Sequence, residues 1–109
     1  MKIKKVTQEY IEFDNGNMIE IGYPQSLCGH NYADFENIDS IAWDTDFNEE
    51  LIFEEHEDGY GFRFGSKGTP MFFIPCYSEQ NGFYSSVVNV LYKGKTVLYN
   101  VYGEIKDIW

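Results

Sequence analysis

The 57 residues from Val6 to Phe62 contain no lysine or arginine, although they hold 15 of the 18 carboxylates in the chain. The formal charge of this stretch is therefore −15, whereas the other 52 residues carry eight basic and three acidic side chains. Stability does not require such segregation, because like charges repel one another across a sheet and along a helix. The missing basic residues therefore predict a binding partner that is itself basic.

Cysteine and long apolar runs are also scarce. Cys28 and Cys76 are too few for a scaffold held by disulfides. No apolar run approaches the roughly 18 residues of a membrane span, and no apolar segment of a signal peptide follows the basic start. We therefore expect a cytoplasmic protein with reduced thiols. Its net charge of −10 disfavours direct binding to nucleic acid or to an anionic membrane.

Aromatic residues, in contrast, are abundant. Nine Tyr, nine Phe and two Trp are enough to close a small core without disulfides. The chain is therefore predicted to fold, unlike an acidic disordered tail, which is poor in aromatic residues. Its 109 residues predict a single domain over residues 1–109.

Alternating apolar and polar residues predict β-strands along most of the chain. Residues 10–13 and 18–23 alternate around Asp14-Asn15-Gly16, a sequence that favours a tight hairpin turn. From residue 60 onward, apolar stretches alternate with turns that contain glycine. We predict a mainly β (β-rich α+β) fold, an antiparallel meander sheet of six to eight strands with one or two short helices near residues 31–51.

The middle of the chain is less clearly patterned. Residues 25–32 are predicted to form a loop, and residues 33–43 fit either a helix or a strand. Residues 46–49 have the form of a capping box, which predicts that a short helix begins there. A strand is predicted from residue 51 to residue 55.

Two segments carry a resemblance to a known family. Residues 65–68 read Gly-Ser-Lys-Gly, and residues 80–88 read Gln-Asn-Gly-Phe-Tyr-Ser-Ser-Val-Val. They resemble the C-terminal signature of a family of small uncharacterised phage proteins, in which lysine-glycine, a strand and an Asn-Gly-Tyr-Tyr-Ser run follow one another. Where that family carries an aspartate-cysteine-cysteine-glutamate loop, residues 25–30 have one cysteine and no acid. The resemblance implies a phage-type origin and a β-rich fold, and it implies no activity.

The candidate binding surface is the acidic segment at residues 34–58, which holds 11 carboxylates. Carboxylates spaced about 6.6–6.8 Å apart along strands present negative charge at a density comparable to that of duplex DNA. The alternative is a solvated acidic surface that aids solubility. Exposed aromatic residues such as Trp43, Phe47 and Tyr60 would add anchoring contacts. The predicted partner-binding residues are Asp34, Glu36, Asp39, Trp43, Asp44, Asp46, Phe47, Glu49, Glu50, Glu54, Glu55, Glu57 and Asp58.

Metal and catalytic patterns are weaker. Residues 44–55 follow the register of a calcium-binding EF-hand loop, but Glu49 stands where the sharp turn needs glycine. The possible zinc ligands Cys28, His30, His56 and Cys76 match no known spacing. The possible nucleophiles Ser85 and Ser86 lie in no catalytic motif with His30 or His56. We therefore predict no cofactor, no metal and no enzymatic activity.

Together these patterns predict a small acidic phage-type inhibitor, with anti-CRISPR-like or DNA-mimic action. It would bind a basic, nucleic-acid-binding defence protein in the cytoplasm of the host cell. One alternative is a sponge for a nucleotide immune signal, which would use aromatic stacking with Arg63, Lys67, Lys93 and Lys95 and would need a dimer or a higher oligomer to form its pocket. Another is a virion or assembly accessory protein without a ligand. The sequence leaves a homodimer open.

Overall fold

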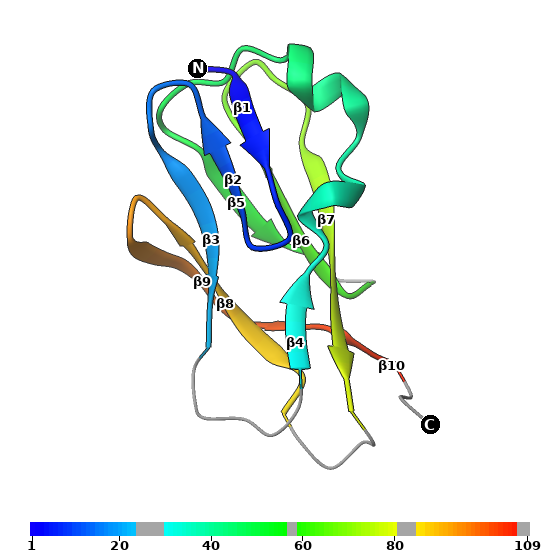
Figure 1. Ribbon diagram of the computed structural model, residues 1–109. Coiled ribbons are helices and arrows are strands. Elements are labelled where there is room, and N and C mark those ends of the chain that lie inside the picture. The colour runs from blue at the N-terminus through cyan, green and yellow to red at the C-terminus, as the bar shows by residue number, and fades with distance from the viewer. Residues whose placement is uncertain (24–29, 57–58, 81–84, 107–109) are drawn as a thin grey trace.

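The computed structural model describes residues 1–23, 30–56, 59–80 and 85–106, which form ten strands and two short 3₁₀ helices (Figure 1). The strands are β1 (Ile3–Val6), β2 (Tyr10–Phe13), β3 (Met18–Gly22), β4 (His30–Ala33), β5 (Ile52–Glu55), β6 (Gly61–Gly65), β7 (Phe72–Glu79), β8 (Val87–Tyr92), β9 (Lys95–Tyr102) and β10 (Glu104–Lys106). The helices are η1 (Phe35–Asn37) and η2 (Ser40–Asp44).

The strands form two five-stranded sheets. The first has the order β1-β2-β3-β8-β9, with every neighbouring pair antiparallel. The second has the order β10-β7-β6-β5, with β4 also paired to β7, and only β10 runs parallel to its neighbour. The mainly β class is confirmed. The predicted single meander is replaced by two sheets, because β8 returns to pair with β3 after the intervening strands have built the second sheet.

Two turns fix the hairpins of the first sheet. Gly16 closes the first hairpin at a φ of 90°, a conformation that glycine adopts without strain, and the Phe13 amide donates to the Asn17 carbonyl at 2.8 Å. Lys93 and Gly94 both have positive φ, 55° and 77°, as a two-residue turn between β8 and β9 requires. The first turn lies at the predicted Asp14-Asn15-Gly16, and the second is one of the glycine-containing turns predicted after residue 60.

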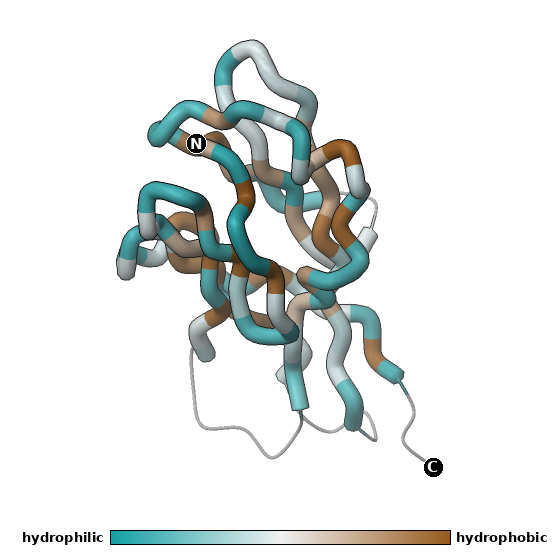
Figure 2. Tube along the Cα trace, turned by 45° about the horizontal axis from the view of Figure 1, so that its top comes forward, coloured by the Kyte–Doolittle hydropathy of each residue, from teal (hydrophilic) through white to brown (hydrophobic). Residues whose placement is uncertain are grey.

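The two sheets share one hydrophobic core. Figure 2 shows hydrophobic and hydrophilic residues alternating along several strands, as expected when one face of a strand is buried. At the centre of the core, the Phe47 ring lies 5.7 Å from the ring of Phe13 in the first sheet. It also lies 5.6 Å from the ring of Phe64 and 5.7 Å from that of Phe72, both in the second sheet. Phe47 is 2% exposed, so its predicted role as an exposed anchor is wrong.

The two short helices lie within the predicted region, residues 31–51, but the predicted helix start is wrong. No helix begins at residues 46–49, and the two 3₁₀ helices lie earlier, between residues 35 and 44. Asp39 caps η2 by accepting a hydrogen bond from the Ile41 amide at 3.0 Å. Asp46 instead accepts from the Met1 amino group at 2.9 Å, and Phe47 enters the core. No helix in the described part of the chain is long and apolar enough to cross a membrane.

The position of Phe47 generates a stability prediction. Phe47→Ala removes a ring that contacts both sheets, so it should lower the free energy of unfolding by about 3–5 kcal/mol. Tyr60→Ala, at a side chain that is half exposed, should change it by at most about 1 kcal/mol. Chemical denaturation of both variants checks this, and equal losses would contradict the central place of Phe47 in the core.

Candidate functional site

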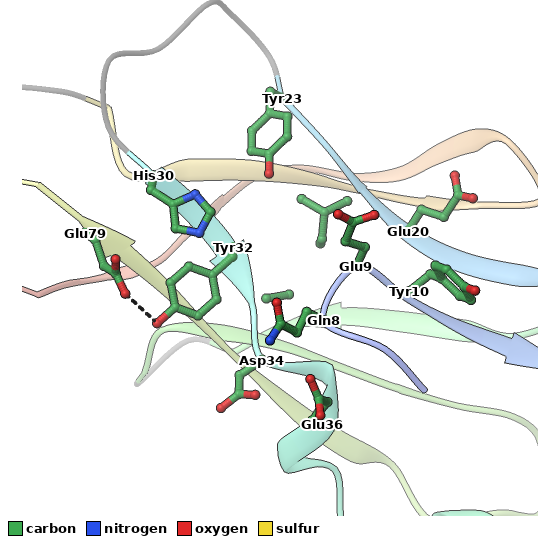
Figure 3. Close-up of a pocket in the computed structure, with 12 residues that line it drawn as sticks. Gln8, Glu9, Tyr10, Glu20, Tyr23, His30, Tyr32, Asp34, Glu36 and Glu79 are labelled. Carbon is green, nitrogen blue, oxygen red and sulfur yellow. Dashed lines mark hydrogen bonds between the residues drawn. The ribbon is translucent and has the colours of Figure 1, made fainter. Parts of the chain in front are cut away.

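A cleft of about 770 Å³ opens between the two sheets, in the size range of ligand sites (Figure 3). One wall comes from the β1–β2 turn, β2 and β3, and the other from β4, η1 and the end of β7. The described lining residues are Gln8, Glu9, Tyr10, Glu20, Ile21, Tyr23, His30, Tyr32, Ala33, Asp34, Glu36 and Glu79.

The lining carries charge of a single sign. Five of these residues are carboxylates, namely Glu9, Glu20, Asp34, Glu36 and Glu79. None of the described lining residues is lysine or arginine. A cleft with charge of one sign and low-dielectric walls concentrates the electrostatic potential and attracts ions of the opposite sign. The chemistry of this cleft therefore suits a cation.

Strand β4 supplies the aromatic part of the second wall. His30 and Tyr32 point outward into the cleft, whereas the alternate residues Asn31 and Ala33 are buried. The His30 ring stacks on the Tyr32 ring at 5.1 Å. The Tyr32 hydroxyl donates to Glu79 at 3.3 Å (Figure 3).

The environment of Tyr32 raises the pKa of its hydroxyl. Burial is the main cause, because it disfavours the charged phenolate. The Glu79 carboxylate adds to the effect by its charge and by its hydrogen bond, and Asp34 adds a smaller one. Tyr32 therefore stays protonated and remains a donor to Glu79.

A buried polar network fixes β4 between the two sheets. The Asn31 amide nitrogen donates to the Ser85 carbonyl at 3.0 Å and to the Val87 carbonyl, on β8, at 3.2 Å. Its amide oxygen accepts from the hydroxyl of Ser78 on β7, which also accepts from the Gln80 side chain. Because one buried side chain bonds to both sheets, the β4 wall of the cleft is held in place.

The first wall combines a tyrosine with carboxylates. Tyr10 and Glu20 lie directly opposite each other on β2 and β3, so their side chains share a face of the sheet. The Glu9 backbone amide donates a hydrogen bond to the Thr7 hydroxyl at 3.1 Å. At the end of this wall, the Tyr23 hydroxyl donates across the cleft to the Asn31 carbonyl at 3.0 Å. The Tyr23 ring thus has a fixed direction while remaining 57% exposed.

The predicted binding residues do not gather at this cleft. Of those that the structure describes, only Asp34 and Glu36 line it. The exposed residues away from the cleft are Asp39, Trp43, Asp44, Asp46, Glu49, Glu50, Glu54 and Glu55. Glu57 and Asp58 lie outside the described residues. Glu54 and Glu55 are neighbours on β5, so they point to opposite faces of the sheet rather than forming one surface. Glu54 also lies 3.8 Å from Arg63.

The sequence prediction missed the other cleft residues. Glu9, Glu20 and Glu79 lie outside the acidic segment, and only the pairing of β4 with β7 brings Glu79 near the first sheet. His30 and Tyr32 fell in a predicted loop, although residues 30–33 form a strand in which exposed His30 and half-buried Tyr32 alternate with buried Asn31 and Ala33. The sequence His-Asn-Tyr-Ala does not show this alternation, because the buried residue Asn31 is polar.

In the described part of the chain, no three His, Cys, Asp or Glu side chains lie close enough together to hold a metal ion. Cys28 lies outside this part of the chain. Cys76 is buried, which raises the pKa of its thiol to about 12. Cys76 therefore remains a neutral thiol, whereas a metal ligand must be a thiolate.

Comparisons of the chain with models of protein families, with curated proteins and with solved structures find no match. The functional interpretation therefore depends on the cleft itself.

The Tyr32–Glu79 contact gives a direct test of the electrostatics of the cleft. Glu79→Gln removes the carboxylate charge, so the pKa of the Tyr32 hydroxyl should fall toward its ordinary value. Glu36→Gln serves as the matched control, because Glu36 also lines the cleft but is not among the groups that shift Tyr32. NMR titration of the Tyr32 ring measures both, and an unchanged pKa in Glu79→Gln would contradict the contact.

Proposed function

We propose that this protein is a non-enzymatic inhibitor that binds a basic, nucleic-acid-binding protein through its acidic cleft. The observation that carries the proposal is the convergence of carboxylates from five separate positions along the chain. None of the described lining residues offers a compensating lysine or arginine. Such a site gains most from a ligand that brings the missing positive charge.

The energetics favour a cationic ligand. Carboxylates held close together repel one another, and this repulsion weakens the folded state until a cation enters. A partner's lysine or arginine side chains would be partly desolvated inside the cleft, where charge pairs contribute more than they do on an open surface. Phosphate groups would be repelled by the same carboxylates. The protein would therefore bind the surface on which its partner normally holds phosphates.

The proposal also covers the biological setting in which the protein acts. The C-terminal segments that resemble small phage proteins support an inhibitor of a host defence protein, such as a CRISPR effector, acting in the host cytoplasm. Such effectors hold nucleic acid in positively charged channels. A protein that covers those positive charges would block nucleic acid from binding.

The nucleotide-sponge alternative has less support. Its four basic residues, Arg63, Lys67, Lys93 and Lys95, do not line the cleft. A nucleotide phosphate in the cleft would meet carboxylates instead of donors such as lysine and arginine. The alternative of an accessory protein without a ligand gives no reason for the cleft's charge.

Charge removal in the cleft tests the proposal. The double variant Glu20→Gln and Glu79→Gln keeps the size of both side chains and removes two charges. Its affinity for a short peptide of mixed lysine and arginine should fall about tenfold, which corresponds to about 1.4 kcal/mol. The matched control, Glu50→Gln with Glu55→Gln, removes two exposed charges away from the cleft and should change affinity less than about threefold. Isothermal titration calorimetry measures both.

Salt provides the second arm of this experiment. Binding of the peptide to the unchanged protein should weaken as salt rises, because salt screens the contributing charges. Affinity that is independent of salt, or a control pair that loses as much affinity as the cleft pair, would place binding elsewhere.

In lysate of a bacterial host, the protein should retain a nucleic-acid-binding protein at low salt and release it at high salt. Failure to retain such a protein would contradict the anti-defence setting.

A further inference from the structure

We infer that the cleft is selective for guanidinium over ammonium, so that an arginine side chain of the partner is the group that enters it. This inference rests on the proposed function and specifies the chemistry of the same site. Both side chains carry one positive charge, so the carboxylates alone do not distinguish them. The distinction comes from the aromatic rings that stand among the carboxylates.

Tyr23 is the first of these rings. Its hydroxyl is held by the Asn31 carbonyl at 3.0 Å, and Asn31 is itself bonded to both sheets. The ring nevertheless remains 57% exposed at the cleft. A ring that is fixed in direction before a ligand arrives loses little conformational entropy on binding. A planar guanidinium can stack on such a face, whereas an ammonium has no plane to stack.

The second aromatic element is a row of three rings. His30 stacks on Tyr32 at 5.1 Å, and Tyr32 lies 5.6 Å from Tyr77. The Lys106 ammonium sits 4.0 Å from the centroid of the Tyr77 ring, a cation–π contact within the protein. Tyr77 and Lys106 do not line the cleft, but His30 and Tyr32 do. The protein's own cation thus occupies the far end of the row, and the cleft end presents rings to a ligand.

Carboxylates stand on both sides of the rings. On the first wall, the Glu9 carboxylate lies nearer to the rings than that of Glu20, which points away from them, and on the second wall Glu79 stands beside Tyr32 (Figure 3). A guanidinium lying on an aromatic face directs its five N–H groups outward in one plane, where carboxylates accept them in pairs. An ammonium is more strongly hydrated than a guanidinium, so it would lose more favourable hydration on entering the cleft. The combination of rings and flanking carboxylates therefore favours arginine.

Three short peptides test the selectivity. They are identical except that their cationic positions hold arginine, lysine or the neutral analogue citrulline. Isothermal titration calorimetry should show the arginine peptide binding about 5- to 10-fold more tightly than the lysine peptide, in line with one or two added cation–π contacts. The citrulline peptide should not bind measurably, because it lacks the charge.

Aromatic variants locate the source of the preference. Tyr23→Leu and Tyr32→Leu should each weaken binding of the arginine peptide toward the level of the lysine peptide, while binding of the lysine peptide changes little. Tyr23→Phe keeps the ring but loses its hydrogen bond to Asn31, so it should keep the preference for arginine at a lower affinity. Tyr99→Leu, at a 69% exposed tyrosine on β9 outside the cleft, is the matched control and should bind as the unchanged protein does. Melting curves verify that each variant is folded, and Tyr23→Leu decides the question if Tyr32→Leu does not fold.

The outcomes separate this inference from the proposed function. Equal affinity for the arginine and lysine peptides would overturn the inference and leave the acidic binding site intact. A preference for arginine that survives Tyr23→Leu would overturn the assigned aromatic platform. If neither cationic peptide binds, the proposed function and the inference both fail.

Discussion

The buried side chain of Asn31 is the constraint on which the cleft depends. β4 has only four residues, and among the described strands it pairs with β7 alone. The Asn31 amide adds bonds to carbonyls in or next to β8 and to the Ser78 hydroxyl, so one residue ties β4 to both sheets. Its own backbone carbonyl accepts from Tyr23. Because an unpaired buried amide is costly, these bonds restrict β4 to one position. The direction of the outward residues of β4, and hence the second wall of the cleft, follows from that position.

A fixed wall explains how a strongly acidic cleft can exist in a small protein. The carboxylates repel one another, and an adaptable wall would let them move apart into solvent. The core beneath, centred on Phe47 and the rings of both sheets, and the polar network around Asn31 together oppose that movement. The fold therefore keeps these carboxylates around one cleft, where a cationic partner would neutralise their charge. This is the physical basis for proposing that the protein binds a basic partner.

The sequence predicts the local parts of this structure better than the long-range ones. The turn at Asp14–Gly16 and the strands beside it follow from alternation and turn chemistry, which act over a few residues. Pairing of β3 with β8 and of β4 with β7 depends on which faces bury one another, and no local pattern encodes it. The burial of Phe47 has the same origin, since polar residues surround it in sequence and rings surround it in space. For the site, the charge segregation predicted an acidic binding surface. Its location between distant residues such as Glu9 and Glu79 required the tertiary structure.

The most direct test of the central claim is an amide NMR titration with a short arginine-rich peptide at low salt. If the acidic cleft is the binding site, the largest shift changes will fall on its walls: the β1–β2 turn, the end of β3, β4 and the residues around Glu36 and Glu79. Amides of β5 and of the segment around Glu49 should shift little, although they carry exposed carboxylates too. Changes centred on β5 and Glu49, or spread evenly over all acidic residues, would contradict the claim that the cleft, rather than net charge, determines binding.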